Sequence, residues 1–281
     1  MSRDIWAESC NTVFLKKEFF VNLHFENPGF LYSLDSILLF QTEDDSPFWS
    51  DPILYFYPQI DGSELQKRDA YGKKEYLSNI LLEVYSGLEP ELNRKINLYN
   101  DHFAKYRRQI EAALSDAFGF NTETVFNDLT GNITLNPVGP RFLEEHIFDV
   151  FYKNSERGAL GISIHEMIHY VWFFVWNKHF GDGYNEYERP SMKWILSEMV
   201  VESIMKDERL SSINPYFPRE NGGCVYPYFQ DMAIDNVPIL DTIDCLYRKN
   251  NITDFMEAAY RCCLQNETAI RAHIEAAEKS F

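Results

Sequence analysis

Residues 159–180 read ALGISIHEMIHYVWFFVWNKHF, and the fold is best approached from this stretch. Its regular spacing predicts a helix with apolar side chains on every side. Leu160 and Ile164 fall on the side opposite the two central histidines, whereas Ile162 and Trp172 flank them. A helix that is apolar all round lies at the centre of a protein. The segment therefore predicts a buried central helix.

The same helix carries His165-Glu166-Met167-Ile168-His169, an H-E-x-x-H motif. Residues four apart differ by about 40° and one helical turn, so both imidazoles can reach one tetrahedral metal ion. Glu166 is turned about 60–100° away and can approach a metal-activated water without binding the ion. Zinc makes such a water acidic enough for a carboxylate to take its proton. The motif predicts Zn²⁺ bound by His165 and His169, with Glu166 as general base.

Two other interpretations of this helix are weaker. Two histidines can be satisfied in a helical core, but burying them beside a carboxylate without a partner costs free energy, which a bound cation would offset. Intramembrane proteases also carry the motif. However, His165, Glu166 and His169 interrupt the apolar run, and no second stretch of about 20 apolar residues exists.

A third ligand is expected on the next helix, which reads SMKWILSEMVVESIM over residues 191–205. A third histidine six residues after His169 would indicate a metzincin, but Val175 stands there. Glu198 and Glu202 lie four residues apart among apolar neighbours. Like charges at this spacing repel, so a solvated acidic face is one explanation. The better explanation is that both carboxylates are turned toward a bound cation.

With these residues the sequence resembles the gluzincin zinc metallopeptidases, the thermolysin-like group, over residues 160–204. The resemblance implies that Glu198 is the third ligand of one zinc ion per chain. It also implies that Glu202 orients His165. Ser197 and Val201 depart from the thermolysin signature, where Asn and Ser stand. Glu188 is nearer the thermolysin spacing but lies in the turn-rich loop 181–190, so it is the second choice.

The resemblance also implies supporting groups. An edge strand before the motif helix would bind an extended peptide, and residues 132–136 occupy that place; an ordinary strand is the alternative. A donor for the oxyanion is expected from Tyr226 or Tyr228, which follow Gly222 and Gly223. Packing is the alternative role for either tyrosine.

The overall pattern predicts an α+β fold that is predominantly helical. We expect a mixed strand and helix lobe over residues 1–120 and a zincin-like catalytic lobe over residues 121–281, without a flexible linker between them. The expected strands are 12–25, 31–40, 53–57, 124–127 and 132–136. The expected helices begin near residue 67 and include 91–118, 141–153, 159–180, 191–207 and 229–248, with two more from 253 to the end.

Composition limits the partners and the compartment. With 26 Lys and Arg against 43 Asp and Glu, the net charge is −17, which argues against nucleic acid and anionic membranes as partners. Five cysteines without a C-x-x-C pair, and no apolar run near Met1, indicate a cytoplasmic protein with reduced thiols. The expected partner is a peptide or protein substrate.

The sequence therefore predicts a zinc peptidase with two alternatives. One is a non-catalytic interaction protein with a structural metal or none, in which a fourth protein ligand would close the site. The other is a zinc hydrolase that acts on a non-peptide amide or ester, because the attack chemistry is the same.

Overall fold

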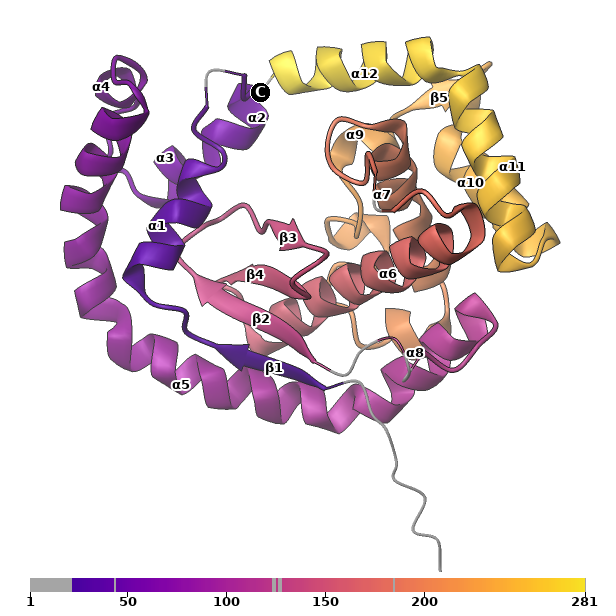
Figure 1. The fold of residues 1–281 in the computed structure, drawn as a ribbon, viewed down its shortest axis with the longest axis horizontal. Coiled ribbons are helices and arrows are strands. Elements are labelled where there is room, and N and C mark those ends of the chain that lie inside the picture. Colours follow the sequence, from indigo (N-terminus) through magenta and orange to yellow (C-terminus); the bar gives the residue numbers. More distant parts are fainter. Residues whose placement is uncertain (1–21, 43, 123–124, 126–127, 184, 281) are drawn as a thin grey trace, which may run out of the picture.

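The computed structural model describes residues 22–280 except 43, 123, 124, 126, 127 and 184. Most described residues are helical, and a four-stranded mixed sheet lies near the centre (Figure 1). The prediction of a predominantly helical α+β fold is therefore confirmed. Most of the expected strand 124–127 and residues 12–21 of the first expected strand lie outside the described residues.

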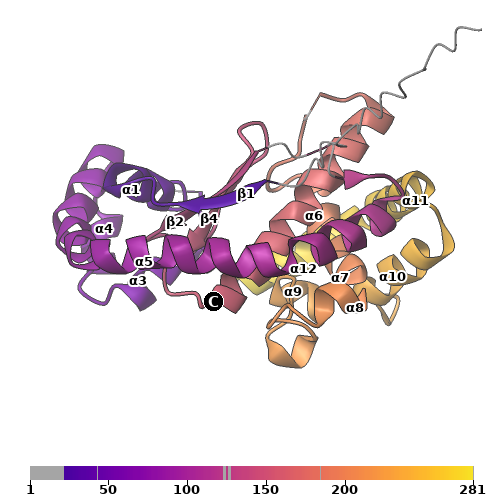
Figure 2. The same ribbon diagram turned by 90° about the horizontal axis from the view of Figure 1, so that it is seen from below.

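Helix α5 (Ala70–Phe118) is the longest element, with 49 residues. The Asp69 side chain caps its first turn by accepting a hydrogen bond from Gly72 N at 2.8 Å, and Gly119 ends it with φ of 71°. Figure 2 shows the helix running along most of the molecule, past the sheet and on to α6. Leu77, Tyr99 and Ile110 are buried along its inner side. The predicted helix 91–118 is thus the second half of a longer one.

The central sheet has the strand order β1-β2-β4-β3 and is parallel except for β3. Its strands are β1 (Leu23–Glu26), β2 (Leu129–Thr134), β3 (Arg141–Phe142) and β4 (Ile147–Phe151). The prediction that residues 132–136 form an edge strand is wrong, because β2 pairs with β1 on one side and β4 on the other. The edges are β1 and β3.

Two segments expected as strands are helices instead. Residues 31–40 fall largely in α1 (Phe30–Leu38), whose buried residues Ser33, Leu34 and Ile37 recur with helical spacing. Residues 53–57 fall in α3 (Pro52–Phe56), where the proline occupies the first helical position. Both errors have one cause, since a short apolar run buries equally well as a strand or as one face of a helix.

The opposite error occurs at residues 141–153, which were expected to be helical but contain β3 and β4. His146 adopts a positive φ of 58° and lets the chain turn between the two strands. Phe148 and Val150 are completely buried. β4 lies inside the sheet and is buried on both faces, with Asp149 as its one polar residue, so it lacks the alternation that marks a strand with one exposed face.

Helices α6 (Glu156–Phe180) and α7 (Met192–Met205) confirm the two helices expected around the motif. Ser155 and Ser191 cap their first turns by accepting hydrogen bonds from Gly158 N and Trp194 N, both at 3.1 Å. α6 is buried on nearly every side, packed between α5 and α7. Among the described residues, no helix combines the length and apolarity needed to cross a bilayer.

The chain after α7 consists of helices, an irregular stretch between α8 (Glu208–Ser211) and α9 (Pro227–Gln230), and one hairpin. Positive φ angles at Asp235 and Asn236 form its turn, so the predicted helix 229–248 is wrong over its first half. The last helix extends back toward α2 (Figure 1). The remaining elements are α2 (Pro47–Ser50), α4 (Gly62–Gln66), α8 (Glu208–Ser211), the 3₁₀ helix Arg219–Asn221, α9 (Pro227–Gln230), β5 (Ala233–Ile234), β6 (Val237–Pro238), α10 (Ile239–Lys249), α11 (Ile252–Gln265) and α12 (Glu267–Lys279).

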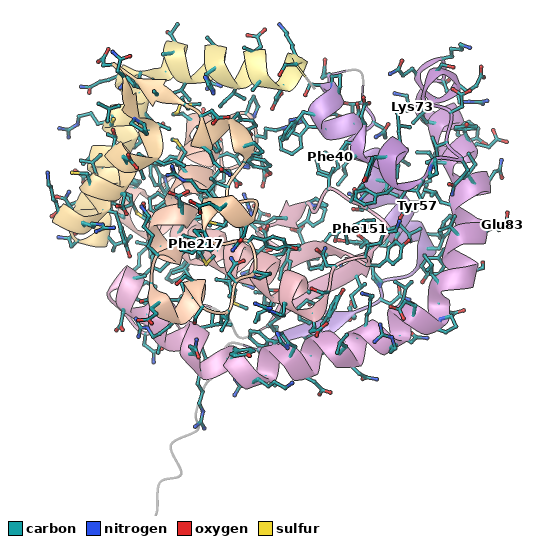
Figure 3. All side chains as sticks on the ribbon, turned by 180° about the vertical axis from the view of Figure 1, so that it is seen from behind. Phe40, Tyr57, Lys73, Glu83, Phe151 and Phe217 are labelled. Atoms are coloured by element: carbon teal, nitrogen blue, oxygen red, sulfur yellow. The ribbon has the colours of Figure 1, made fainter. Side chains whose placement is uncertain are left out.

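A layer of aromatic side chains joins the short N-terminal helices to the sheet. The Tyr57 hydroxyl donates to the carbonyl oxygen of Leu135 at 2.7 Å, and the rings of Phe56 and Phe151 lie 4.7 Å apart. Figure 3 labels Tyr57 and Phe151 in this layer. These contacts place α3 against the segment that begins at Leu135, directly after β2.

Candidate metal centre

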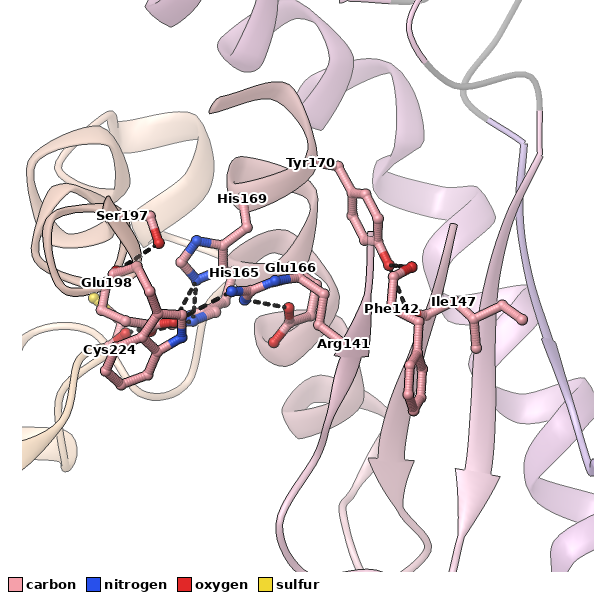
Figure 4. A network of polar contacts seen from close by, with 11 residues as sticks. Arg141, Phe142, Ile147, His165, Glu166, His169, Tyr170, Ser197, Glu198 and Cys224 are labelled. Atoms are coloured by element: carbon pink, nitrogen blue, oxygen red, sulfur yellow. Dashed lines mark hydrogen bonds and ion pairs between the residues drawn. The ribbon is translucent and has the colours of Figure 1, made fainter. Parts of the chain in front are cut away.

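The motif helix and the following helix bring three predicted ligands together. His165 and His169 project from α6 and Glu198 from α7, and one ligand atom from each lies within 4.8 Å of the others. The Nε2 atoms of the histidines are 2.8 Å apart. The Glu198 oxygens lie 3.2 Å from Nε2 of His165 and 3.3 Å from Nε2 of His169 (Figure 4). Among the described residues, no fourth side chain joins this group.

These distances fit a tetrahedral metal ion. With bonds of about 2.0–2.1 Å, ligand atoms at the corners of a tetrahedron are about 3.3 Å apart. The two contacts between histidine and carboxylate match this spacing, and the contact between the imidazoles is shorter. Oε2 of Glu198 is buried and forms no hydrogen bond, although Nε2 of His165 lies 3.2 Å from it. A buried carboxylate oxygen in this state costs free energy, and a cation at the centre of the group would offset that cost.

His165 is held in the orientation that a ligand needs. Its Nδ1 lies 3.0 Å from the backbone oxygen of Cys224. A carbonyl oxygen only accepts, so Nδ1 carries a hydrogen and Nε2 is the nitrogen that faces the group. In the neutral imidazole the lone pair of Nε2 is available to a cation. A backbone carbonyl thus has the orienting role that the resemblance assigned to Glu202.

Glu202 has a different partner. Its carboxylate accepts hydrogen bonds from Nε of Arg219 at 2.8 Å and from Nη2 at 2.5 Å. The prediction that Glu202 orients His165 is therefore corrected. The chain folds back over α7 after α8, which brings Arg219 to Glu202 and Cys224 to His165. Contacts between segments so far apart in the chain cannot be predicted from the spacing of the motif.

The protonation of the histidines follows their surroundings. Burial lowers the pKa of His169 to about 4, and the nearby Arg141 charge acts in the same direction. Burial also acts to lower the pKa of His165, but the contact with Glu198 outweighs it and the pKa lies above its usual value. His169 is therefore neutral near pH 7 and can offer a nitrogen lone pair.

Glu166 contacts an arginine that the sequence interpretation missed. Its Oε2 accepts a hydrogen bond from Nη1 of Arg141 at 3.1 Å, and Nη2 of Arg141 lies 3.6 Å from Oε1 of Glu198. The side chain of Arg141 is only 7% exposed. Because residues 141–153 were expected to be helical, nothing placed Arg141 near the motif. The sequence did place several acidic residues in segments expected to be buried, and this excess was the signal that a buried cation was required.

Two cavities meet at the candidate site. The smaller has a volume of about 280 Å³ and the larger about 490 Å³. Both are lined by Pro137, Gly139, His165, Glu166, Tyr226 and Pro227. Glu198 and Arg141 line only the larger one. The proposed base and the first ligand therefore lie where the two cavities adjoin.

The structure separates the two candidate tyrosines. Tyr226 lines both cavities, and burial together with the charges of Glu198 and Glu166 holds its pKa well above its usual value. Its hydroxyl thus stays protonated and able to donate. Tyr228 lines neither cavity, and its ring stacks on Tyr226 with centroids 5.3 Å apart. Only Tyr226 is placed to reach a group in the site.

Glu188, the second choice for third ligand, lies outside the ligand group. It lines the larger cavity, where burial raises its pKa. Glu198 on α7 takes the position beside the histidines instead. Two imidazoles and one carboxylate, of which His165 and Glu198 line the larger cavity, form a donor set of the kind that binds catalytic zinc. Comparison of the chain with protein-family models, with curated proteins and with solved structures finds no match.

Proposed function

We propose that this protein is a zinc-dependent hydrolase that cleaves peptide bonds, with a zincin-like catalytic lobe of the gluzincin type. One observation carries the proposal. His165, His169 and Glu198 converge within 4.8 Å, and two of them, His165 and Glu198, line a cavity that Glu166 also lines. Three protein ligands and an open side are typical of catalytic zinc sites, whereas structural sites are closed by a fourth ligand.

The donor set favours zinc. Neutral imidazole and carboxylate together suit this ion, which binds them with tetrahedral geometry. When bound, zinc supplies Lewis acidity, which polarises a substrate carbonyl and makes a water molecule acidic. The residues that would hold it are His165 and His169 through Nε2 and Glu198 through its carboxylate.

The protein residues perform the proton transfers. Glu166 has Oε2 engaged by Arg141, so Oε1 is the oxygen available to take a proton from water. Tyr226 lines both cavities and its hydroxyl stays protonated, so it can donate to the negative oxygen that develops during attack. Glu166 then returns the proton to the leaving amine.

A polypeptide substrate is supported by the shape of the site. Two adjoining cavities share His165 and Glu166, which would leave room for residues before and after the bond to be cut. The edge strand nearest the site is β3, whose Arg141 lines the larger cavity. The strand role predicted for residues 132–136 is therefore better proposed for β3, which can bind an extended chain along its free edge.

The proposal is tested by zinc content and by Glu166→Gln. Protein purified without chelators is expected to contain one zinc per chain by elemental analysis. Glu166→Gln should keep that zinc, because the amide does not alter the ligands, and should lose hydrolysis of a fluorescent peptide library by about 10²–10⁴-fold. Glu111→Gln is the matched control, since this glutamate is also buried and near an arginine but lies on α5.

The control should retain both zinc and hydrolysis. A wild-type protein without stoichiometric zinc would remove the basis of the proposal. Undiminished cleavage by Glu166→Gln would show that another group accepts the proton. A Glu198→Ala protein with wild-type zinc affinity would exclude Glu198 as the third ligand.

A further inference from the structure

Arg141 holds two carboxylates of the site with one side chain. Its Nη1 donates to Oε2 of Glu166 at 3.1 Å, and its Nη2 lies 3.6 Å from Oε1 of Glu198. All three side chains are nearly inaccessible, with exposures of 7% for Arg141, 9% for Glu166 and 2% for Glu198. The guanidinium also lies over the ring of Phe173, 5.9 Å from its centroid. Figure 4 shows Arg141 reaching Glu166 from β3.

This arrangement separates two carboxylates with different tasks. Glu198 faces the histidines, whereas Glu166 is turned toward Arg141 and lies outside the ligand group. A freed glutamate at this place on α6 would have a strong electrostatic reason to turn toward a bound cation. A carboxylate that bound the metal would fill the open position and could no longer act as a base.

We propose that Arg141 is a positioning residue that keeps Glu166 from becoming a fourth metal ligand. The inference rests on the proposed function and deepens it. The Nη1 and Nη2 groups of Arg141 face two different carboxylates, those of Glu166 and Glu198. The planar guanidinium can do this, whereas the single ammonium group of lysine cannot.

The inference predicts an unusual combination of effects in Arg141→Met. Removing the guanidinium removes a positive charge beside the ion and frees Glu166 to bind it. Both changes strengthen zinc binding, while hydrolysis is lost because the base is occupied. A residue with a merely structural role would weaken zinc binding and hydrolysis together, since its loss would spread the ligands apart.

The experiment measures zinc affinity by competition with a chromophoric chelator and, separately, peptide hydrolysis. Arg141→Met is expected to bind zinc about 10-fold more tightly, because a positive charge beside the ion is removed, and to lose about 100-fold in kcat. Adding Glu166→Gln to Arg141→Met should reverse part of the gain in affinity, because the freed ligand is then absent. Lys95→Met, which removes a buried cation on α5, should leave the zinc affinity unchanged.

Arg141→Lys covers the case in which Arg141→Met does not fold. It keeps the charge but cannot hold both carboxylates, so kcat should fall about 10-fold with zinc affinity within about threefold of wild type. Weaker zinc binding by Arg141→Met, or full kcat in Arg141→Lys, would overturn the inference. Wild-type protein that binds no zinc or cleaves no peptide would instead overturn the proposed function.

Discussion

At the scale of single residues, the site depends on which partner each polar atom finds. His165 is oriented by the carbonyl of Cys224, and Glu202 is neutralised by Arg219. Glu198 and Glu202 are four residues apart on one helix and are both buried, yet only Glu198 meets the histidines. Although they are close in sequence, Glu198 contacts the two histidines and Glu202 contacts Arg219.

This difference yields a prediction for Glu202→Gln. The substitution weakens a buried ion pair with Arg219, so the free energy of unfolding should fall by about 1–3 kcal/mol. Zinc affinity should stay within about threefold of wild type, whereas second-shell partners of a ligand typically change it by 10–100-fold. Chemical denaturation and chelator competition measure the two quantities. A large loss of zinc affinity at unchanged stability would return Glu202 to the role of orienting His165.

The contact between Arg141 and Glu166 shows why part of the site could not be predicted. His165, Glu166 and His169 lie within one helical turn, so their spacing alone indicates a shared ion. Arg141 is 25 residues from Glu166 and reaches it only because the chain turns at His146 and pairs β3 with β4. Contacts that depend on sheet pairing are not encoded in helical periodicity.

At the scale of elements, local signals predicted two helix ends correctly. Ser191 and Gly119 bound helices at the predicted positions through bonds within a few residues, whereas the helix capped by Ser155 was expected only from residue 159. The segments 31–40 and 53–57 carry apolar runs whose burial is decided by distant neighbours. Their assignment as strands failed because short apolar runs suit both structures.

Strand β4 places an unusual carboxyl group inside the sheet. Asp149 is 1% exposed and accepts hydrogen bonds from Ser36 Oγ at 2.5 Å and Tyr32 Oη at 3.0 Å. These bonds favour the charged form, but burial outweighs them and raises the pKa of Asp149 to about 7. The folded chain therefore holds this proton more tightly than the unfolded chain does.

The expected consequence is a stability that falls as the pH rises from about 4 to about 7, the interval between the unfolded and folded pKa values. Asp149→Asn should abolish this pH dependence, because asparagine does not titrate. The free energy of unfolding of the variant, relative to that of the wild type, should therefore increase by about 3 kcal/mol between pH 5 and pH 8. Urea denaturation across this range measures the difference. Asp101→Asn on the exposed side of α5 is the control and should show no such trend. A pH-independent difference for Asp149→Asn would contradict the raised pKa.

At the scale of the whole molecule, α12 contacts α2, a helix more than 200 residues earlier in the chain. Glu278 on α12 accepts hydrogen bonds from Nε1 of Trp49 at 2.8 Å and from Oγ of Ser46 at 3.1 Å. Trp49 belongs to α2 and lines the larger cavity. Arg271 on α12 also donates to the backbone oxygen of Pro190 at 2.7 Å, in the loop that precedes α7. α12 therefore joins two walls of that cavity.

Glu278→Ala should loosen Trp49 without touching the ligand group. We expect the free energy of unfolding to fall by about 1–2 kcal/mol, since bonds to a half-buried charge are lost. The KM for peptides should rise while kcat and zinc affinity stay near wild type, because only the cavity wall changes. Glu275→Ala is the matched control, since this glutamate pairs with Lys279 on the exposed side of α12. A fall in kcat at constant KM would argue against this assignment.

The anchoring of α2 by α12 also sets an order of events during synthesis. Trp49 and Glu278 are 229 residues apart, and the proposed ligands His165, His169 and Glu198 leave the ribosome before Glu278 does. At typical translation rates the delay after Glu198 is on the order of ten seconds. For that interval a nascent chain carries the ligand residues but not the residue that fixes the cavity wall. If the cavity binds substrate as proposed, completion of its wall by α12 would postpone that binding until α12 has been synthesised.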